Sequence, residues 1–362
     1  MPSYRYLTQD ALTREVLAWD LPLTDVSFGP ELSGPGSMTG TLEPHLAHLL
    51  TSQADPGNTL IWAERDNTLM WGGVIWRAEP VGAKYPIEAS GFGSYPARRH
   101  DVHGNLAGRG PYVNADPCQV IRDAWAYCQE QPDGDLGVTV EATTSTVTLG
   151  TSAQPYATNW WEAPALSDVI SDAVAVDGGP QWTEQVTWAA GQPSARIRIG
   201  WPRLGTRRTD ISFTTGINIT TSVPVTCDAD TYAQVVVALG TGEGRSRQRA
   251  IDAVRDGRLR LEEVLDLPAV KGTDQLSARA RTERTARQIR GSIEEITVID
   301  HPAAPFGSVQ VGDDVRVVVH DQWTDYEGWA RITGWTLTPA QGDQGEQMTL
   351  RLARADGFTY GA

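Results

Sequence analysis

Short apolar runs separated by glycine, proline and acidic turns fill most of the chain, and this pattern predicts many strands. The clearest case is 59–78, where a β-favouring run leads into the turn pair Asp66-Asn67 and residues 69–76 run back. We predict a hairpin there. Further strands are predicted at 86–95, 138–149, 182–188, 196–201, 210–215, 218–225, 232–239, 293–299, 315–320, 328–338 and 347–353.

The first 54 residues show a less regular pattern. Residues 1–27 mix polar and apolar positions, which predicts an extended segment with a short amphipathic piece at 11–19. Glycine and proline interrupt the first half of 28–54, and residues 43–50 predict a short helical piece.

Apolar residues at helical spacing predict three helices. The first begins at Asp116-Pro117, an N-cap acid followed by proline at the first helical position, and ends at 132–134. The second spans 164–176 and stops at Gly178-Gly179. The third, at 273–290, is rich in arginine. The apolar face of the first helix would hold Val120, Ile121, Ala124, Trp125 and Cys128.

Two of the predicted hairpins resemble each other. Residues 60–76 end in W-G-G-V-I-W, and 317–335 read V-V-V-H-D, a turn with Asp325, then G-W-A-R-I-T-G-W. The likeness favours two related β modules with an α/β insertion between them, although two unrelated hairpins would give a similar pattern. The aromatic residues of these hairpins are Trp62, Trp71, Trp76, Trp329 and Trp335.

Composition and charge narrow the function classes. The chain has 362 residues, 40% of them apolar, which is enough for several domains with sizeable cores. A formal net charge of −15 repels nucleic-acid phosphates and argues against a DNA-binding regulator. The same charge suits a channel that DNA passes through without sticking.

Cysteines and apolar stretches argue against disulfide, zinc and membrane roles. Cys118, Cys128 and Cys227 form no CxxC pair, so they predict neither a disulfide framework nor a structural zinc site. The first 20 residues lack the apolar region of a signal peptide, and no apolar stretch has the length of a membrane span. We expect neither feature in this chain.

The motif Gly240-Thr241-Gly242-Glu243-Gly244 directly follows a predicted strand, which is the place of a dinucleotide-binding turn. Arginine follows where helix–strand packing would need a small residue, and neither βαβ alternation nor a GK[ST] sequence is present. We interpret Gly240, Gly242 and Gly244 as a tight turn at a contact between subunits or domains, and we predict no cofactor.

The sequence contains no complete motif for a hydrolytic active site or a metal site. The pairs His45/His48 and His100/His103 would have to meet in space to bind a metal, and neither has the HExxH arrangement. GxSxG, kinase and Cys–His patterns are missing from the sequence. Carboxylates are plentiful, but their spacing singles out no pair for glycoside hydrolysis. We predict no metal and no catalytic residues.

Tryptophan and arginine distributions leave alternatives open. Trp160-Trp161, or Trp71 with Trp76, could stack on a sugar, whereas tryptophan in strands more often lies in a core or an interface. Residues 242–290 hold 12 basic and 8 acidic residues, a net of +4 against −19 for the rest. The arginine-rich helix could dock on an acidic neighbour or present an ordinary solvated face.

The order of these parts resembles the minor tail proteins of long-tailed phages, especially the tail-hub group of phages of actinobacteria. Four stretches show the likeness. They are LSGPGSMTGTL followed by LIWAERDNTLMWGGVIW, then IEASGFGSYPARR, then YAQVVVALGTGEGRSR, and finally SVQVGDDVRVVV with GWARITGWTLTP and EQMTLRLA. The last contains a turn at Gly312-Asp313. Residues 114–230 are the least similar part.

The resemblance implies a mainly β (α+β) fold with two tail-tube-type β-barrel modules and an inserted α/β region. The modules would be 1–113 with the N-terminal segment and 231–362 with the arginine-rich helix, and the insertion would be 114–230. It implies a homotrimeric ring at the distal end of the tail that joins a sixfold tube to a threefold tip. The family has no common catalytic residues, so the resemblance implies no enzyme.

The resemblance also implies partners and a location. The partners would be further copies of the chain, the distal tail ring, the tape-measure protein and tip or fibre proteins, with DNA only as passing cargo. The protein would be assembled in the host cytoplasm and reside in the virion tail, with contact to the host surface. A tryptophan-rich, carbohydrate-binding tail-tip protein is the main alternative, and a hub with a hydrolase domain is the weakest one.

Overall fold

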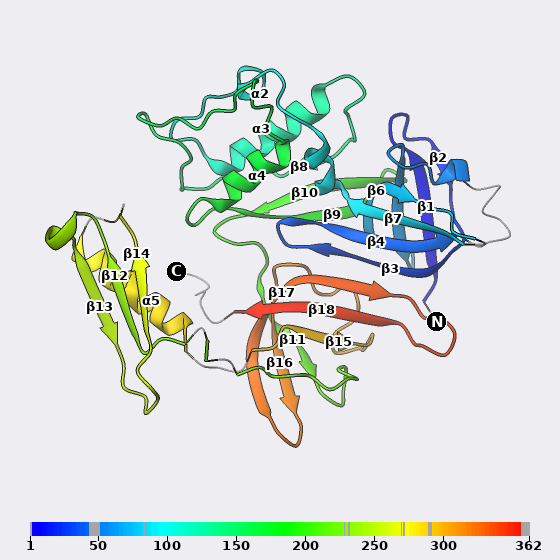
Figure 1. Ribbon diagram of the computed structural model, residues 1–362. Coiled ribbons are helices and arrows are strands. Elements are labelled where there is room, and N and C mark those ends of the chain that lie inside the picture. Colours follow the sequence, from blue (N-terminus) through cyan, green and yellow to red (C-terminus); the bar gives the residue numbers. More distant parts are fainter. Residues whose placement is uncertain are drawn as a thin grey trace.

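The computed structural model describes residues 2–42, 51–82, 84–227, 229–230, 232–268, 270, 272–288 and 292–355. The mainly β fold class is confirmed, because one 12-stranded sheet and two three-stranded sheets account for most of the regular structure (Figure 1). The short helical piece expected at 43–50 lies outside the described residues. In the described part of the chain, no helix is long and apolar enough to cross a membrane.

Antiparallel strands near the N-terminus form what we call the N-terminal module. They follow the order β3-β4-β7-β6-β5-β1-β2 in the large sheet. The predicted hairpin at 59–78 is confirmed. The extended segment predicted at 1–27 is confirmed, because it contains two strands and the start of a third, and residues 11–19 form a turn and the short strand that pairs with β1. The strands are β1 (Tyr4–Asp10), β2 (Val16–Ala18), β3 (Leu23–Glu31), β4 (Gly34–Leu42), β5 (Thr59–Arg65), β6 (Thr68–Ala78) and β7 (Tyr85–Gly91). A 3-10 turn, η1 (Thr51–Gln53), precedes β5.

The helices α3 and α4, two shorter helical turns and a small sheet make up the inserted region that follows. The first two predicted helices are confirmed, and the sheet has the order β8-β10-β9. The strand predicted at 138–149 is wrong beyond its first residues, because Ser145 turns back to bond the N-cap of α3. The elements are η2 (Phe92–Arg98), α2 (Asn105–Gly108), α3 (Pro117–Glu130), β8 (Thr139–Val140), α4 (Leu166–Ala175), β9 (Gln181–Ala189) and β10 (Gln192–Gly200).

The C-terminal module consists of β11 (Arg207–Thr214), β15 (Glu295–Val298), β16 (Asp314–His320), β17 (Asp325–Thr338) and β18 (Gln347–Arg354). It shares the large sheet with the N-terminal module, because β17 pairs with β3 at Leu337 and Phe28 as well as with β16 and β18. The strand predicted at 218–225 is wrong, since only isolated bridges form there.

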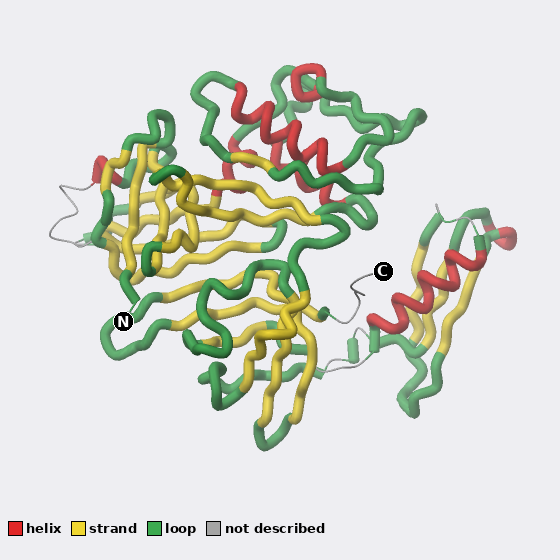
Figure 2. The backbone as a smooth tube through the Cα atoms, turned by 180° about the vertical axis from the view of Figure 1, so that it is seen from behind, coloured by secondary structure: helices red, strands yellow, loops and turns green. Residues whose placement is uncertain are grey.

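A small unit lies apart from these layers (Figures 1 and 2). It contains β12 (Val235–Leu239), η3 (Gly244–Ser246), β13 (Arg249–Ala253), β14 (Glu262–Asp266) and α5 (Thr273–Ala286). The strand at 232–239 was expected to open the second barrel. In the structure, β12 is instead the central strand of a separate sheet. The two strands that follow it in the chain, β13 and β14, pair with its two edges before the chain enters the C-terminal module.

Three hydrophobic cores hold these parts together. The first is continuous between the N-terminal and C-terminal modules. The second joins the outer face of β1, β5 and β6 to the inserted region, and the third lies under α5. Strand β5 contributes Ile61 to the first core and Trp62 to the second. Burial on both faces explains its uninterrupted apolar run.

Candidate functional site

The tryptophans of the first hairpin lie in different environments. Trp62 on β5 belongs to the core beneath the inserted region, where its Nε1 donates to Gln9 Oε1 at 2.9 Å. Trp71 on β6 faces the core shared by the two modules. Trp76 is half-buried, and the guanidinium of Arg98 lies 5.5 Å from its ring centroid. Because Trp62 and Trp71 are buried, these three rings do not form a shared sugar-stacking surface.

The second hairpin supplies one further core residue. Trp335 on β17 packs edge-on against Phe28 on β3, with ring centroids 6.2 Å apart. Trp71 therefore shares a core with Trp335, at the place where the two modules meet. Trp329 is half-buried, with the Arg207 guanidinium 4.7 Å from its ring centroid. Of the five hairpin tryptophans, only Trp71 and Trp335 therefore lie in the core shared by the two modules, and the other three lie elsewhere in the structure.

A buried acid fastens the end of the inserted region to the C-terminal module. The Asp314 side chain is fully buried, and its oxygens lie 2.6 Å from Arg203 and 3.5 Å from Arg207. The neighbouring Asp313 accepts a hydrogen bond from Thr206 N at 2.9 Å. Buried carboxylates need such charged and hydrogen-bonded partners to remain stable. The sequence pattern predicts a turn at Gly312-Asp313, but it does not predict that the neighbouring acids bind Arg203 and Thr206 of the preceding region.

The glycine-rich turn lies inside the small unit. A Cβ on Gly240 would sit 2.7 Å from Leu276 Cδ1 of α5 and 2.9 Å from Val270 O. Gly242 has a φ of +115° and Gly244 a φ of +53°, and residues other than glycine rarely adopt such backbone angles. The turn therefore lets α5 approach the end of β12. Its use as a contact between subunits stays a prediction.

An exposed aromatic pair projects from a loop of the inserted region. Trp160 and Trp161 are 62% and 66% exposed, and their rings are nearly perpendicular, with centroids 5.7 Å apart. The fully buried Asp101 supports this loop, because it accepts hydrogen bonds from Thr158 Oγ1 at 2.6 Å and from Leu106 N at 2.9 Å. The perpendicular rings form no flat platform, but each presents an open edge or face.

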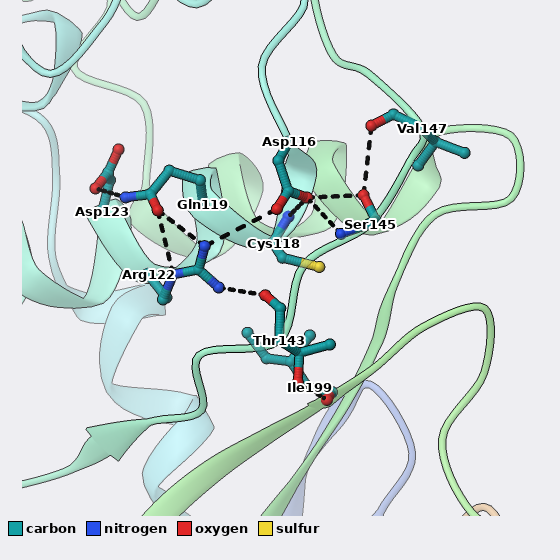
Figure 3. A network of polar contacts seen from close by, with 9 residues as sticks. All are labelled: Asp116, Cys118, Gln119, Arg122, Asp123, Thr143, Ser145, Val147 and Ile199. Atoms are coloured by element: carbon teal, nitrogen blue, oxygen red, sulfur yellow. Dashed lines mark hydrogen bonds and ion pairs between the residues drawn. The ribbon is translucent and has the colours of Figure 1, made fainter.

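Helix α3 begins in a polar network that could suggest nucleophilic chemistry (Figure 3). Asp116 Oδ1 accepts from Cys118 N at 2.9 Å and from Ser145 Oγ at 2.7 Å, and Arg122 donates to the Thr143 carbonyl. Burial first, and then the Asp116 charge, raises the pKa of the Cys118 thiol to about 11. A thiol with such a pKa supplies little thiolate at neutral pH. The network caps the N-terminus of α3 and ties it to the segment that follows β8.

The histidines do not assemble a metal site in the described part of the chain. His100 Nδ1 lies 2.8 Å from Ala163 O, and His103 Nδ1 lies 2.8 Å from Tyr127 OH. His45 and His48 lie outside the described residues. Among the residues that are described, no group of three or more His, Cys, Asp or Glu side chains is placed to hold a metal.

One carboxyl group is unusual in its surroundings. Glu184 on β9 is half-buried as a residue, but its Oε2 is shielded from solvent and has no hydrogen-bond partner among the described atoms. Its Oε1 accepts from Gly93 N at 2.5 Å. Burial raises the pKa of Glu184 to about 8. No sequence pattern indicates this environment, because Glu184 occupies an ordinary polar position in an alternating strand.

The pocket between η2, β9 and α4 has a volume of about 480 Å³. Its lining is mainly apolar and serine side chains, including Trp76, Trp182 and Ile170. Among the described residues, no carboxylate lines it, so it does not offer the pair of acids that glycoside hydrolysis requires.

Comparisons with known proteins place the fold. No family model matches the sequence, and no curated protein matches it. The chain is similar to the 43 kDa tail protein of prophage MuSo2 from Shewanella oneidensis, with a TM-score of 0.61 and 13% identity over 98% of this chain and 99% of that one. It is similar to a tail protein from Neisseria meningitidis MC58, with a TM-score of 0.58 and 12% identity over 97% of each chain.

A third solved structure shows the same likeness. It is the prophage tail protein gp18 from Listeria monocytogenes EGD-e, with a TM-score of 0.53 and 10% identity over 97% of this chain and 95% of that one. At such identities the likeness is one of fold. The resemblance to tail proteins found in the sequence is therefore confirmed at the level of fold over nearly the whole chain.

Proposed function

We propose that this chain is a structural component of a phage tail. More specifically, it would be a hub at the distal end, in which three copies form a ring that joins a sixfold tube to a threefold tip and lines the DNA conduit. The main support is the fold shared with three solved tail proteins over at least 95% of each chain. The tail-hub group of actinobacterial phages is the group that the sequence motifs favour.

The arrangement of the two strand modules gives this proposal a physical basis. Each chain contributes an N-terminal and a C-terminal module that share one sheet and one core. Three chains would present six such modules, which matches a threefold ring to a sixfold tube. We propose the division 1–113, 114–230 and 231–362 along the sequence, with the small unit as an excursion within the third part. In space, η2 and α2 pack with helices of the inserted region, and β11 pairs with β16 of the third part.

The charge of the chain fits a conduit for DNA. A net charge of −15 would keep phosphates from adhering to the wall. DNA would then be passing cargo, and the stable partners would be the distal tail ring, the tape-measure protein and tip or fibre proteins. On this proposal the chain is not an enzyme, and its location is the virion tail after assembly in the host cytoplasm.

Sedimentation velocity of the purified full-length protein tests the ring. We expect a trimer, alone or after mixing with the adjacent tail proteins. A protein that stays monomeric in both conditions would contradict the proposal. Imaging of particles that carry a labelled chain should place the label at the distal end of the tail, and a label elsewhere would reject the hub position.

The exposed pair Trp160 and Trp161 favours a second candidate function, recognition of cell-wall sugars at the tail tip. Aromatic rings on a well-supported loop are suited to stack on sugar faces. Binding of wall polysaccharide to the wild type and its loss in the Trp160→Ala, Trp161→Ala double variant would support this function. Binding that does not depend on these residues would reject it. A trimer that binds no polysaccharide would leave the hub as the sole candidate.

A further inference from the structure

The small unit is covered on one side only. Helix α5 lies on one face of its sheet (Figure 2). Leu276 and Ala280 of the helix join Val236 and Ala238 of β12 in a common core. The opposite face carries no helix in Figure 1, where the strands lie in front of α5. Residues of β12 alternate between these two faces, so Val237 points away from the helix.

The strand register places three β-branched residues in line on that uncovered side. Val237 pairs with Ile251 of β13 on one side and with Val264 of β14 on the other. Ile251 and Val264 are each 56% exposed. We call this row the open face. An apolar row across a whole sheet is costly in water and usually marks a contact surface.

The same unit holds further exposed apolar side chains near this row. Leu259 is 83% exposed and Leu261 is 41% exposed, and both lie in the connection that leads into β14. The described contacts that join the unit to the rest of its own chain run through α5 and the segments that follow it. They include the ion pair of Arg279 with Asp177 and the hydrogen bond from Arg354 to the Ala286 carbonyl. The open face is therefore not covered by these intramolecular contacts.

Charge identifies what could cover the open face. Among the described residues, five exposed arginines of the small unit take part in no ion pair, and they are Arg245, Arg249, Arg255, Arg258 and Arg281. The segment 242–290 has a net charge of +4, whereas the rest of the chain has −19. That rest offers exposed acids that form no ion pair within the described residues, such as Asp55, Asp133 and Asp343. The surface complementary to the small unit is thus the body of another copy.

Symmetry restricts how two copies can meet. In a threefold ring each contact joins two different surfaces, because a patch that pairs with itself generates a twofold axis instead. The basic, apolar small unit and the acidic body of the same chain are two such different surfaces. A heterologous contact between them can close into a ring.

We propose that the open face of the small unit, formed by Val237, Ile251 and Val264, docks against the acidic body of the next copy of this chain. This inference rests on the proposed ring and names the surface that holds it together. The apolar row supplies the buried area, and the surrounding arginines select an acidic partner and set the register.

The test compares the oligomeric state of full-length variants. In the double variant Ile251→Asp, Val264→Asp, two charges would have to be buried in the contact, and we expect trimer formation to weaken by about a hundredfold or more. The control Leu12→Asp alters a residue that is 52% exposed on the turn after β1, and it should remain a trimer. Amide hydrogen exchange in β12 and α5 that matches the wild-type protein would show that the small unit of the double variant is folded. High salt should weaken the wild-type trimer, because it screens the arginines.

Cross-linking identifies the surface that contacts the open face. Ile251→Cys in a Cys227→Ser background provides one exposed thiol for a benzophenone label, since Cys118 and Cys128 are buried. We expect a cross-link from position 251 to a peptide outside the small unit of another copy. A wild-type protein that stays monomeric both alone and with the adjacent tail proteins would contradict both the ring and this inference. A wild-type trimer whose double variant stays trimeric, or whose label reaches another small unit or a different tail protein, would overturn this inference and leave the ring intact.

Discussion

At the scale of single residues, glycines let the hairpin tryptophans lie flat against the strands. A Cβ on Gly72 would lie 2.5 Å from Trp62 Cε3, and a Cβ on Gly73 would lie 2.8 Å from Trp71 Cη2 and 2.2 Å from the Ser90 carbonyl oxygen. The W-G-G pattern is therefore a packing device, in which each large ring needs the missing side chain of a neighbour. The sequence shows the pattern but not which ring each glycine serves.

Gly240 gives a prediction at this scale. Gly240→Ala places a methyl group between Leu276 and Val270, and such overpacking should destabilise the small unit by about 1–3 kcal/mol. The 13 tryptophans of the chain all lie outside β12–α5, so fluorescence will not report the change. Amide hydrogen exchange followed by mass spectrometry should show faster exchange in β12 and α5. Gly345→Ala, which has no atom within 4 Å of the added Cβ, is the control. Equal exchange in both variants would refute the packing role of Gly240.

Glu184 predicts a pH dependence of stability. Its folded pKa of about 8 lies above the ordinary value of 4.5, so the folded protein holds a proton there that the unfolded chain has released between these values. Stability from this group is therefore full below about pH 4.5 and falls as pH rises toward 8, by at most about 1.4 kcal/mol per pH unit.

Glu184→Gln should remove that pH dependence, because an amide does not titrate in this range. The amide oxygen can still accept the hydrogen bond from Gly93 N, so the folded structure should be kept. Urea unfolding at pH 5 and pH 8 measures the difference between the two proteins. Glu88→Gln, at an exposed carboxylate paired with Arg77, serves as the control and should keep the wild-type slope. If Glu184→Gln and wild type lose the same stability between these pH values, the carboxyl is not protonated in the folded state.

The cap of α3 was predictable from the sequence, whereas Asp101 and Glu184 were not. Asp116 lies directly before a proline and an apolar helical face, so its role follows from local pattern. The partners of Asp101 and Glu184 include Thr158 and Gly93, which are remote in sequence. A buried acid bound to distant groups looks the same in sequence as a solvated one.

At the scale of elements, prediction succeeded where neighbouring residues decide the outcome. Helices α3 and α4 and the hairpin β5–β6 depend on local periodicity and turn residues, and all three are confirmed. The hairpin of β3 and β4 was missed because Gly29, Pro30 and Gly36 read as breaks. In the structure, Gly29 lies against the backbone of Trp335, and Gly36 lies against Gly29 and the Trp71 ring. Such close approaches require glycine, but the local sequence does not reveal them.

Gly29 tests the junction between the two modules. A Cβ there would lie 1.7 Å from the Trp335 carbonyl oxygen on β17, and a backbone atom cannot move aside as a side chain can. Gly29→Ala should therefore separate β3 from β17 and lower the free energy of unfolding by about 3 kcal/mol or more. Urea unfolding followed by tryptophan fluorescence measures this, with Gly345→Ala again as the unhindered comparison. A midpoint equal to that of Gly345→Ala would contradict the close approach.

At the scale of the whole molecule, the three cores differ greatly in the side chains they bury. The core of the small unit consists mostly of alanines, whereas the core shared by the two modules includes Phe28, Trp71 and Trp335. Since stabilisation grows with buried apolar area, the small unit should be the least stable part. The sequence could not show this, because it placed β12 within a barrel.

This difference predicts the order of opening. Amides of β12 should exchange with solvent faster than those of β17 under native conditions, although both strands are central in their sheets. Hydrogen exchange followed by mass spectrometry measures both segments in one experiment. Uniform protection of β12 and β17 would show that the small unit and the modules unfold together.

The pairing of β3 with β17 also has a consequence for synthesis on the ribosome. Phe28 is made near the start of translation, but its partner Leu337 emerges near the end. Until then β3 presents an unpaired edge, and an exposed edge strand readily joins the wrong partner. Premature termination before β17 should therefore yield nascent chains that aggregate or recruit chaperones. Correct maturation of the N-terminal module would depend on the last strands of the same polypeptide.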